Sequence, residues 1–255
     1  MQKKFLLLGV LFMGVLVSTT AFAIDPMGPP AATIDKGGWS IGVESSYTET
    51  DIKRQLDRGS SACSNAEIEM LRVYANLSYG ISENVTGFVR LGGATMEWER
   101  IPGRSYDWQG TDGDWDFAWG AGVRATLSES DNVSWGFVGQ FSQADLTGKQ
   151  VDKYNDDEGG YKIEMAEFQF AIGPTVKVSD SVRVYGGPFI DIVTGTWSDN
   201  IWDTYRLRKP IEETDWWGGY LGTAIDLSKN SYLNVEGMVT QAGWAVAGGV
   251  MWRCK

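Results

Sequence analysis

The sequence predicts an all-β fold: a closed antiparallel transmembrane up-and-down β-barrel. Three observations lead to this prediction: an amino-terminal export signal, ten stretches of alternating apolar and polar residues, and connections that are alternately short and long. Each stretch is about ten residues long, which is the length of a tilted strand that crosses a membrane. The tight final hairpin near Ala242-Gly243 brings the predicted count to ten, with eight and twelve strands as the alternatives.

The amino-terminal residues predict export. Lys3 and Lys4 are followed by the apolar stretch 5–17 and by the small-x-small sequence AFA at 21–23. This order of features is typical of a signal peptide, here cut after Ala23. The apolar stretch is short for a membrane-spanning helix, and an uncleaved amino-terminal anchor is the alternative interpretation.

The rest of the chain divides into a linker and one domain. Residues 24–36 contain three of the seven prolines and show no periodicity, so we predict a periplasmic amino-terminal linker there. Residues 37–255 repeat one unit, an alternating stretch followed by a polar connection, and form one predicted outer-membrane barrel domain. The signal peptide occupies residues 1–23.

Alternation with a period of two is the main evidence for the strands. A clear example is 70–79, where the residues at odd positions are apolar or aromatic and those at even positions are mostly polar. The predicted strands are 39–47, 70–79, 86–96, 116–127, 133–143, 165–177, 182–194, 217–227, 232–241 and 244–253.

The connections alternate in length. Short turns are predicted at 80–85, 128–132, 178–181 and 228–231. Long polar loops are predicted at 50–66, 99–115, 145–161 and 197–215. In outer-membrane barrels the short turns are periplasmic and the long loops extracellular, so we predict both termini on the periplasmic side of the cell outer membrane.

The charges within the predicted strands share one face. They lie opposite the aliphatic and aromatic residues, on a face otherwise made of Gly, Ser, Thr, Ala and Gln, which suits a confined lumen. A soluble barrel would show the same alternation, so the loop asymmetry and the aromatic strand ends favour the membrane form. We predict a lumen charge network whose members pair across the interior, with a narrow path for ions or solutes as the alternative. Its members are Glu44, Arg72, Arg90, Asp116, Arg124, Glu167, Lys177, Arg183, Asp191, Asp226 and Glu236.

Trp and Tyr residues concentrate near the ends of the predicted strands. Rings at these positions are typical of the two aromatic girdles at the membrane–water boundaries, whereas ordinary core tryptophans would not favour strand ends. The predicted girdles comprise Trp39, Tyr79, Trp98, Trp115, Trp135, Trp197, Trp216, Trp217, Tyr232, Trp244 and Trp252.

The strand–turn–strand runs 71–91 and 176–188 and the final strand 248–252 resemble the small outer-membrane β-barrel superfamily, the OmpA-like and opacity-protein-like barrels. The resemblance covers nearly the whole mature chain and implies a barrel recognised by the assembly machinery through its last strand. Members of that superfamily usually end on an aromatic residue, whereas Arg253-Cys254-Lys255 follow Trp252 here.

Composition excludes several kinds of chemistry. The chain has no histidine, so the histidine-dependent mechanisms of omptin-type, lipase-type and deacylase-type barrels are unavailable, and we predict no catalytic residues and no cofactor. The net charge of −11 gives no basic footprint for nucleic acid. The acidic runs Asp112/Asp114/Asp116 and Asp156-Asp157-Glu158 do not continue as EF-hand loops, so we predict solvated loop tips and no metal site, with Ca²⁺ as the alternative.

The two cysteines, Cys63 and Cys254, test this topology. The first lies in a predicted extracellular loop and the second at the predicted periplasmic end, so we expect no disulfide between them.

The predicted function is a structural or surface-interaction role in the outer membrane, with a lumen largely filled by the charge network. The alternatives are a narrow porin-like channel and a soluble, lipocalin-like ligand-binding barrel. The predicted partners are outer-membrane lipid, lipopolysaccharide, and the barrel assembly machinery during biogenesis.

Overall fold

A computed structural model describes residues 25–55, 63–99, 108–152, 158–201, 205–212 and 216–254. The signal peptide predicted at 1–23 lies outside these residues. The regular elements of the described chain are antiparallel strands: β1 (Trp39–Gln55), β2 (Cys63–Ser82), β3 (Val85–Glu99), β4 (Trp108–Gly113), β5 (Asp116–Glu129), β6 (Val133–Asp152), β7 (Glu158–Lys177), β8 (Val182–Ile201), β9 (Tyr205–Glu212), β10 (Trp217–Asp226), β11 (Ser231–Thr240) and β12 (Gly243–Cys254). None of the described residues forms a helix long and apolar enough to cross a membrane.

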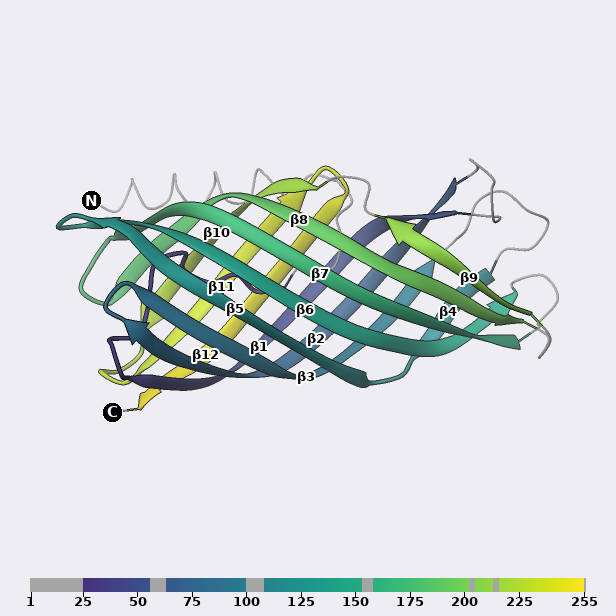
Figure 1. Cartoon of the computed structure of the whole chain (residues 1–255), viewed down its shortest axis with the longest axis horizontal. Helices are drawn as coiled ribbons and strands as arrows, with labels where there is room; N and C mark the ends of the chain where they lie inside the picture. Colours follow the sequence, from purple (N-terminus) through teal and green to yellow (C-terminus); the bar gives the residue numbers. More distant parts are fainter. Residues whose placement is uncertain are drawn as a thin grey trace, which may run out of the picture.

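Backbone pairing closes the strands into a ring, seen from the side in Figure 1. β4 and β5 both pair with β3 and β6, so these two strands follow one path interrupted at Asp114-Trp115. β9 and β10 likewise both pair with β8 and share a second path. The twelve hydrogen-bonded strands therefore run along ten up-and-down paths, which correspond to the ten predicted strands.

The barrel has fewer strands at its long-loop end. The hairpin between β11 and β12 turns back at Thr240–Gly243, and beyond it β9 pairs directly with β1, through Lys53↔Glu212 and Arg54↔Ile211. Two strands thus drop out of the ring, which leaves β1, β2, β3, β4, β6, β7, β8 and β9 to close that end. A ring of about eight strands has an interior just wide enough to be filled by side chains.

Several strands extend far into the regions predicted as long loops. β2 begins at Cys63, and β6 and β7 pair from Val133↔Val176 out to Val151↔Glu158. The reason is that apolar and polar residues continue to alternate in these segments, but there the apolar residues face inward and the polar residues face outward. In 67–70, for instance, Ile68 and Met70 are buried whereas Glu67 and Glu69 are exposed. Beyond the membrane-facing band the barrel wall follows the rule of a soluble barrel, with polar residues outward and apolar residues inward.

The short connections gather at the opposite end, together with the end of β12 (Figure 1). In the turn after β7 the Lys177 ammonium lies 2.9 Å from the Asp180 carboxylate and lowers the pKa of that exposed carboxyl group.

The positions of the two cysteines agree with the predicted topology. Across β1, Cys63 pairs with Gln55 and Cys254 with Trp39. Trp39 and Gln55 are the two ends of the 17-residue strand β1, so these partners lie about 50 Å apart. Cys254 is an exposed free thiol.

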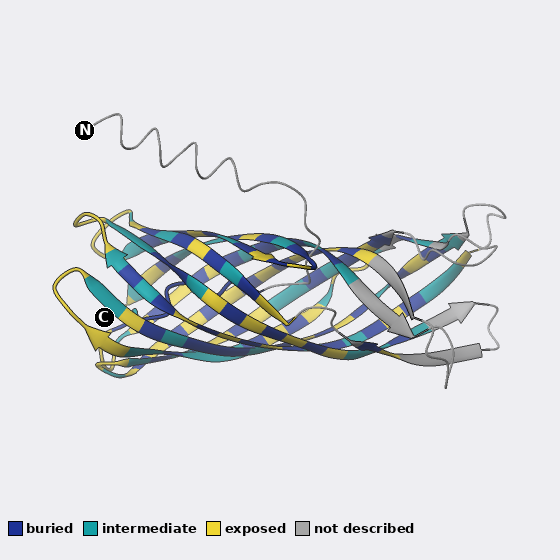
Figure 2. Ribbon diagram, turned by 90° about the horizontal axis from the view of Figure 1, so that it is seen from above, coloured by how far each residue is buried: buried dark blue, intermediate teal, exposed yellow. Residues whose placement is uncertain are grey.

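In the central band, aliphatic and aromatic side chains point outward. Ile41, Val43, Leu221, Val235 and Val246 are each about half exposed, and Figure 2 shows the resulting alternation of exposed and buried residues along the strands. Among the predicted girdle residues, a further group is likewise exposed: Trp39, Tyr79, Trp115, Trp135, Trp216, Trp217 and Trp252. Trp244 is half-buried, and its ring is tilted against that of Tyr47 on β1, with the ring centroids 5.6 Å apart.

The prediction was wrong for three girdle residues. Trp98, Trp197 and Tyr232 are buried inside the barrel. Parity along each strand explains this result, because Trp98 shares the inward face of β3 with Arg90, and Tyr232 shares that of β11 with Glu236. These residues were predicted at the membrane boundary because they lie near strand ends. Whether such a side chain faces the lumen or the lipid depends on the side of the sheet from which it projects.

Candidate functional site

The interior of the barrel contains the start of the described chain. Residues 25–31 are buried, and residues 25–35, which we call the N-terminal segment, run inside the ring before β1 begins. The prediction of a periplasmic linker at 24–36 was therefore wrong for these residues. A linker would expose its backbone to water, whereas this segment is hydrogen-bonded to side chains of several strands.

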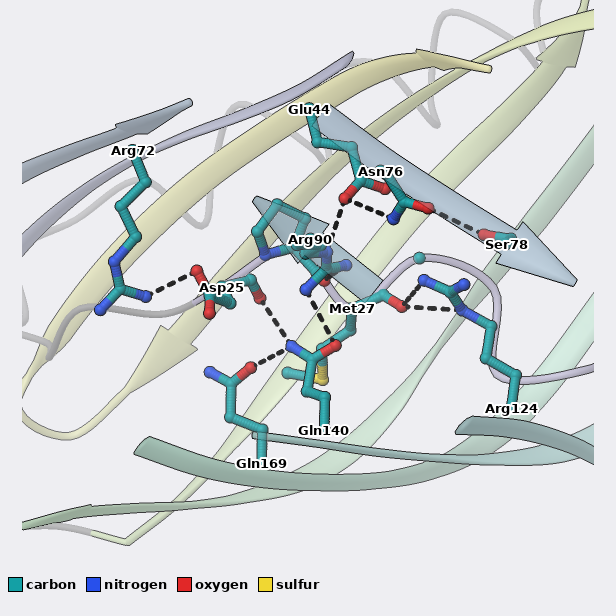
Figure 3. A network of polar contacts seen from close by, with 12 residues as sticks. Asp25, Met27, Glu44, Arg72, Asn76, Ser78, Arg90, Arg124, Gln140 and Gln169 are labelled. Carbon is teal, nitrogen blue, oxygen red and sulfur yellow. Dashed lines mark hydrogen bonds and ion pairs between the residues drawn. The ribbon is translucent and has the colours of Figure 1, made fainter. Parts of the chain in front are cut away.

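Asp25 lies in the centre of a buried ionic cluster (Figure 3). Its Oδ1 is 2.6 Å from Nη1 of Arg72 on β2, and Nη2 of the same guanidinium is 2.9 Å from Oε2 of Glu167 on β7. The Asp25 amide also donates to Glu167 Oε1 at 3.3 Å. All three side chains are almost completely buried, so the cluster joins the segment to two distant strands.

A second cluster surrounds Arg90 on β3. Its guanidinium donates to Glu44 Oε2 at 2.7 Å, to Gln140 Oε1 at 3.2 Å and to the carbonyl oxygen of Pro26 at 2.5 Å. Gln140 Nε2 in turn donates to Gln169 Oε1 and, at 3.4 Å, to the Asp25 carbonyl oxygen (Figure 3). The two clusters thus meet on the backbone of residues 25 and 26.

The main chain around Met27 is held from opposite sides. Both oxygens of the Glu236 carboxylate accept amide hydrogen bonds, from Met27 at 2.6 Å and from Gly28 at 2.9 Å. Arg124 donates to the Met27 carbonyl oxygen at 2.8 Å. The ring of Phe88 lies 4.3 Å from the Arg124 guanidinium carbon and 4.7 Å from that of Arg90. The Met27 side chain itself packs in an apolar cluster that includes Phe88.

Towards the turn end the segment approaches the barrel wall closely. The Thr86 hydroxyl accepts the amides of Thr33 and Ile34, and Thr126 accepts that of Ala32. The wall has glycines where the backbones come nearest. An added Cβ at Gly80 would lie 2.0 Å from the Asp35 carbonyl oxygen, and one at Gly136 would lie 2.4 Å from the Ala31 nitrogen. These positions accept the segment only because they lack a side chain.

At the long-loop side of the ionic clusters the interior is apolar. Trp98 packs edge-on against Trp197 with ring centroids 5.2 Å apart, and Tyr161 lies beside both rings. The remaining members of this buried cluster are Ile68, Met70, Tyr74, Ala94, Met96, Ala118, Ala144, Leu146, Ile163, Met165, Val193, Ile211 and Ala242. The narrow eight-stranded end is therefore filled by large side chains.

Neither a protein-family model nor a curated protein matches this chain. Solved structures do match. The outer membrane protease OmpT from Escherichia coli aligns over 87% of this chain and 96% of that chain, with a TM-score of 0.52 and 8% identity. The chain has the outer-membrane β-barrel fold. The translocator domain of the autotransporter NalP from Neisseria meningitidis aligns over 87% and 89% of the two chains, with a TM-score of 0.48 and 10% identity. At 8% identity the likeness to OmpT concerns the fold and not the activity.

The structure of this outer-membrane barrel brings seven of the eleven predicted lumen charges into the interior. They are Glu44, Arg72, Arg90, Arg124, Glu167, Asp191 and Glu236. Of the other four, Arg183, Asp226 and Lys177 lie at the turn end of the barrel, and Asp116 lies at the break between β4 and β5. Arg183 pairs with Asp226 at 2.9 Å in a partly exposed position, Lys177 is exposed, and Asp116 accepts hydrogen bonds from the amide and hydroxyl of Thr147.

Sequence reasoning missed the central member of the network, Asp25, and with it the whole N-terminal segment. No apolar period marks residues 25–35, and three prolines are as common in linkers as in buried extended segments. The acidic loop residues add little to the site. Asp156 and Asp157 lie outside the described residues, and among the residues described no group of three or more metal-ligating side chains is placed to hold an ion.

Proposed function

We propose that this protein is an integral outer-membrane barrel with a structural or surface-interaction role, whose lumen is closed at rest by its own N-terminal segment. The observation that carries the proposal is the buried set of contacts between residues 25–34 and six strands of the wall, namely β2, β3, β5, β6, β7 and β11. The short turns and both termini would be periplasmic and the long-loop end extracellular.

The outward apolar band and the inward charges support the membrane form over the soluble, lipocalin-like alternative, in which the apolar faces would point inward. The lack of histidine supports a non-catalytic role. We propose outer-membrane lipid and lipopolysaccharide as partners of the outer surface, and the barrel assembly machinery as a partner during biogenesis.

A narrow channel is the second candidate function. The layer of paired charges in the middle of the lumen favours it, since departure of the N-terminal segment would leave those charges facing a water-filled path. The two candidates differ in the state of the lumen at rest.

Planar-bilayer recording of the purified full-length chain tests the proposal. The wild-type chain is expected to show no sustained conductance steps. A variant in which residues 25–34 are replaced by an equally long Gly/Ser sequence is expected to show stable steps, because the replaced sequence retains none of the anchoring side chains. Sustained steps from the wild-type chain at rest would contradict closure and favour the channel.

A charge placed on the outward face tests membrane insertion. Val43 lies midway between Trp39 and Tyr47 on the outward face of β1 and is 53% exposed. We expect Val43→Arg to lower the free energy of unfolding in lipid vesicles by about 2–4 kcal/mol, because the charge would face the bilayer centre. Glu49→Arg on the same strand, where the outward face is already polar, is the matched control and should change it by less than about 1 kcal/mol. Equal effects of the two variants would argue against a lipid-facing band.

A further inference from the structure

The amide groups at the start of the N-terminal segment donate to carboxylates of the barrel wall. Glu167 Oε1 accepts the amide of Asp25 at 3.3 Å. The next residue is a proline and has no N–H. Both oxygens of Glu236 accept the two amides that follow, those of Met27 and Gly28. The amide hydrogens of residues 25–28 therefore all have a carboxylate partner on the wall.

The carbonyl groups of residues 25–27 accept hydrogen bonds from other side chains of the wall. Gln140 Nε2 donates to the oxygen of residue 25 at 3.4 Å, Arg90 to that of residue 26 at 2.5 Å, and Arg124 to that of residue 27 at 2.8 Å (Figure 3). The wall thus offers a matching acceptor or donor to each of these main-chain groups. Contacts to the main chain bind a peptide whatever most of its side chains are.

Three positions of the segment add selectivity for side chains. The carboxylate of Asp25 lies 2.6 Å from the Arg72 guanidinium, which favours an acidic residue there. The side chain of Met27 is completely buried in an apolar cluster. Gly28 has a φ of 67°, and an added Cβ would lie 2.9 Å from Nη2 of Arg124, so glycine is favoured at this position. The lumen therefore selects the pattern acidic–x–apolar–glycine.

We propose that the lumen is a binding site for a peptide of another chain, which carries this acidic–x–apolar–glycine pattern and takes the place of the protein's own segment. The contacts at residues 25–28 are non-covalent and lie away from the junction with β1, so a separate peptide can make the same ones. The N-terminal segment is then a tethered competitor of this ligand. The inference rests on the proposed closure of the lumen by that segment.

The turn end of the barrel is the entrance for such a peptide. The chain leaves the lumen at this end, where the Gly37 amide donates to the carbonyl oxygen of Gly80 at 2.8 Å. The opposite end is filled by the aromatic cluster around Trp98 and Trp197. A ligand therefore follows the path of residues 25–36 and comes from the side that we propose to be periplasmic.

The first test measures binding in trans. The receptor is the purified full-length variant in which residues 25–34 are replaced by Gly/Ser. The probe is the peptide of residues 25–36, capped at both ends and labelled on Lys36, which is exposed in the protein. By fluorescence anisotropy we expect saturable binding to this variant and at least roughly tenfold weaker binding to the wild-type chain, because its tethered segment competes at high effective concentration. A folded variant without saturable binding would overturn the proposal.

The contribution of the acidic residue is measured by a double-mutant cycle. We expect Asp25→Asn in the peptide to weaken binding roughly tenfold to a hundredfold, the range for loss of a charged hydrogen bond. In a receptor that also carries Arg72→Met, the two peptides should bind almost equally. The same loss in both receptors would overturn the assignment of Arg72 as the residue that selects the acid.

Recognition of the main chain is measured with an ester bond in the peptide. An ester in place of the Met27 amide removes one donor and leaves every side chain unchanged. We expect binding to weaken roughly tenfold to a hundredfold when the receptor has Glu236. The loss should be much smaller with Glu236→Gln, whose side-chain amide donates to the ester oxygen. Equal losses in the two receptors would contradict recognition of the main chain, and this pair does not depend on the stability of Arg72→Met.

Circular dichroism establishes that the Gly/Ser-replaced receptor is folded. If it is not, the full-length variant Asp25→Asn/Gly28→Ala takes its place, because its segment keeps its length but loses the Arg72 contact and gains a Cβ close to Arg124. Failure of the proposed function is seen separately, because the unmodified wild-type chain then conducts. A wild-type chain that is closed at rest, together with a receptor that binds no peptide, would overturn this inference alone.

Discussion

Replacement of Arg72 by methionine is expected to lower the free energy of unfolding by about 3–5 kcal/mol, because it leaves two carboxylates buried without their cation. Arg72 is 2% exposed and bonds Asp25 at 2.6 Å and Glu167 at 2.9 Å. Methionine keeps much of the side-chain volume, so the loss reports on charge more than on packing. The measurement is urea unfolding in lipid vesicles, followed by tryptophan fluorescence.

Arg183→Met is the matched control for this variant. Arg183 also pairs with a carboxylate at 2.9 Å, but its side chain and that of Asp226 are 23% and 25% exposed. Solvent screening limits the expected loss to about 1 kcal/mol or less. In the Arg72→Met background, the further changes Asp25→Asn and Glu167→Gln should recover most of the lost stability. Equal losses from the two arginine variants, or no recovery, would contradict the assignment of a buried ionic cluster.

Substitution of Gly136 by alanine is expected to open the lumen. The added Cβ would lie 2.4 Å from the Ala31 nitrogen and 2.5 Å from the Pro30 carbonyl carbon, and both are backbone atoms that no rotamer change can move. Overpacking of this kind costs about 1–3 kcal/mol, which corresponds to a rise in the open fraction of roughly fivefold to 150-fold. Conductance steps and new protease sensitivity of residues 25–35 are the two readouts.

Gly237→Ala is the matched control for the glycine variant, since an added Cβ at Gly237 on β11 meets nothing within 4 Å. It should remain closed and protected like the wild-type chain. A Gly136→Ala protein that stays closed, with the segment still protected, would show that residues 30 and 31 do not lie against Gly136.

Much of the barrel is predictable from the sequence because strand periodicity is a local property. Alternation located all ten strand paths, and parity placed Glu44, Arg72 and Glu167 on the inward face, where the structure has them. The strand ends were less predictable, because the same period continues with the opposite sense. In 161–165, Tyr161, Ile163 and Met165 are buried whereas Lys162 is exposed. The sequence prediction looked for apolar residues that face lipid, so it ended these strands before the segments in which the apolar residues face inward.

The sequence by itself determined where the strands lie, how short turns and long loops alternate between them, and which strand face carries the charges. Each of these features depends only on residues that are close together along the chain. Only the tertiary structure decided what fills the lumen. The pairing of β1 with β9 narrows one end of the ring, and Asp25 reaches Arg72 and Glu167 across 47 and 142 residues of sequence. No local pattern records such contacts, because their stability comes from buried charges that meet only after the ring has closed.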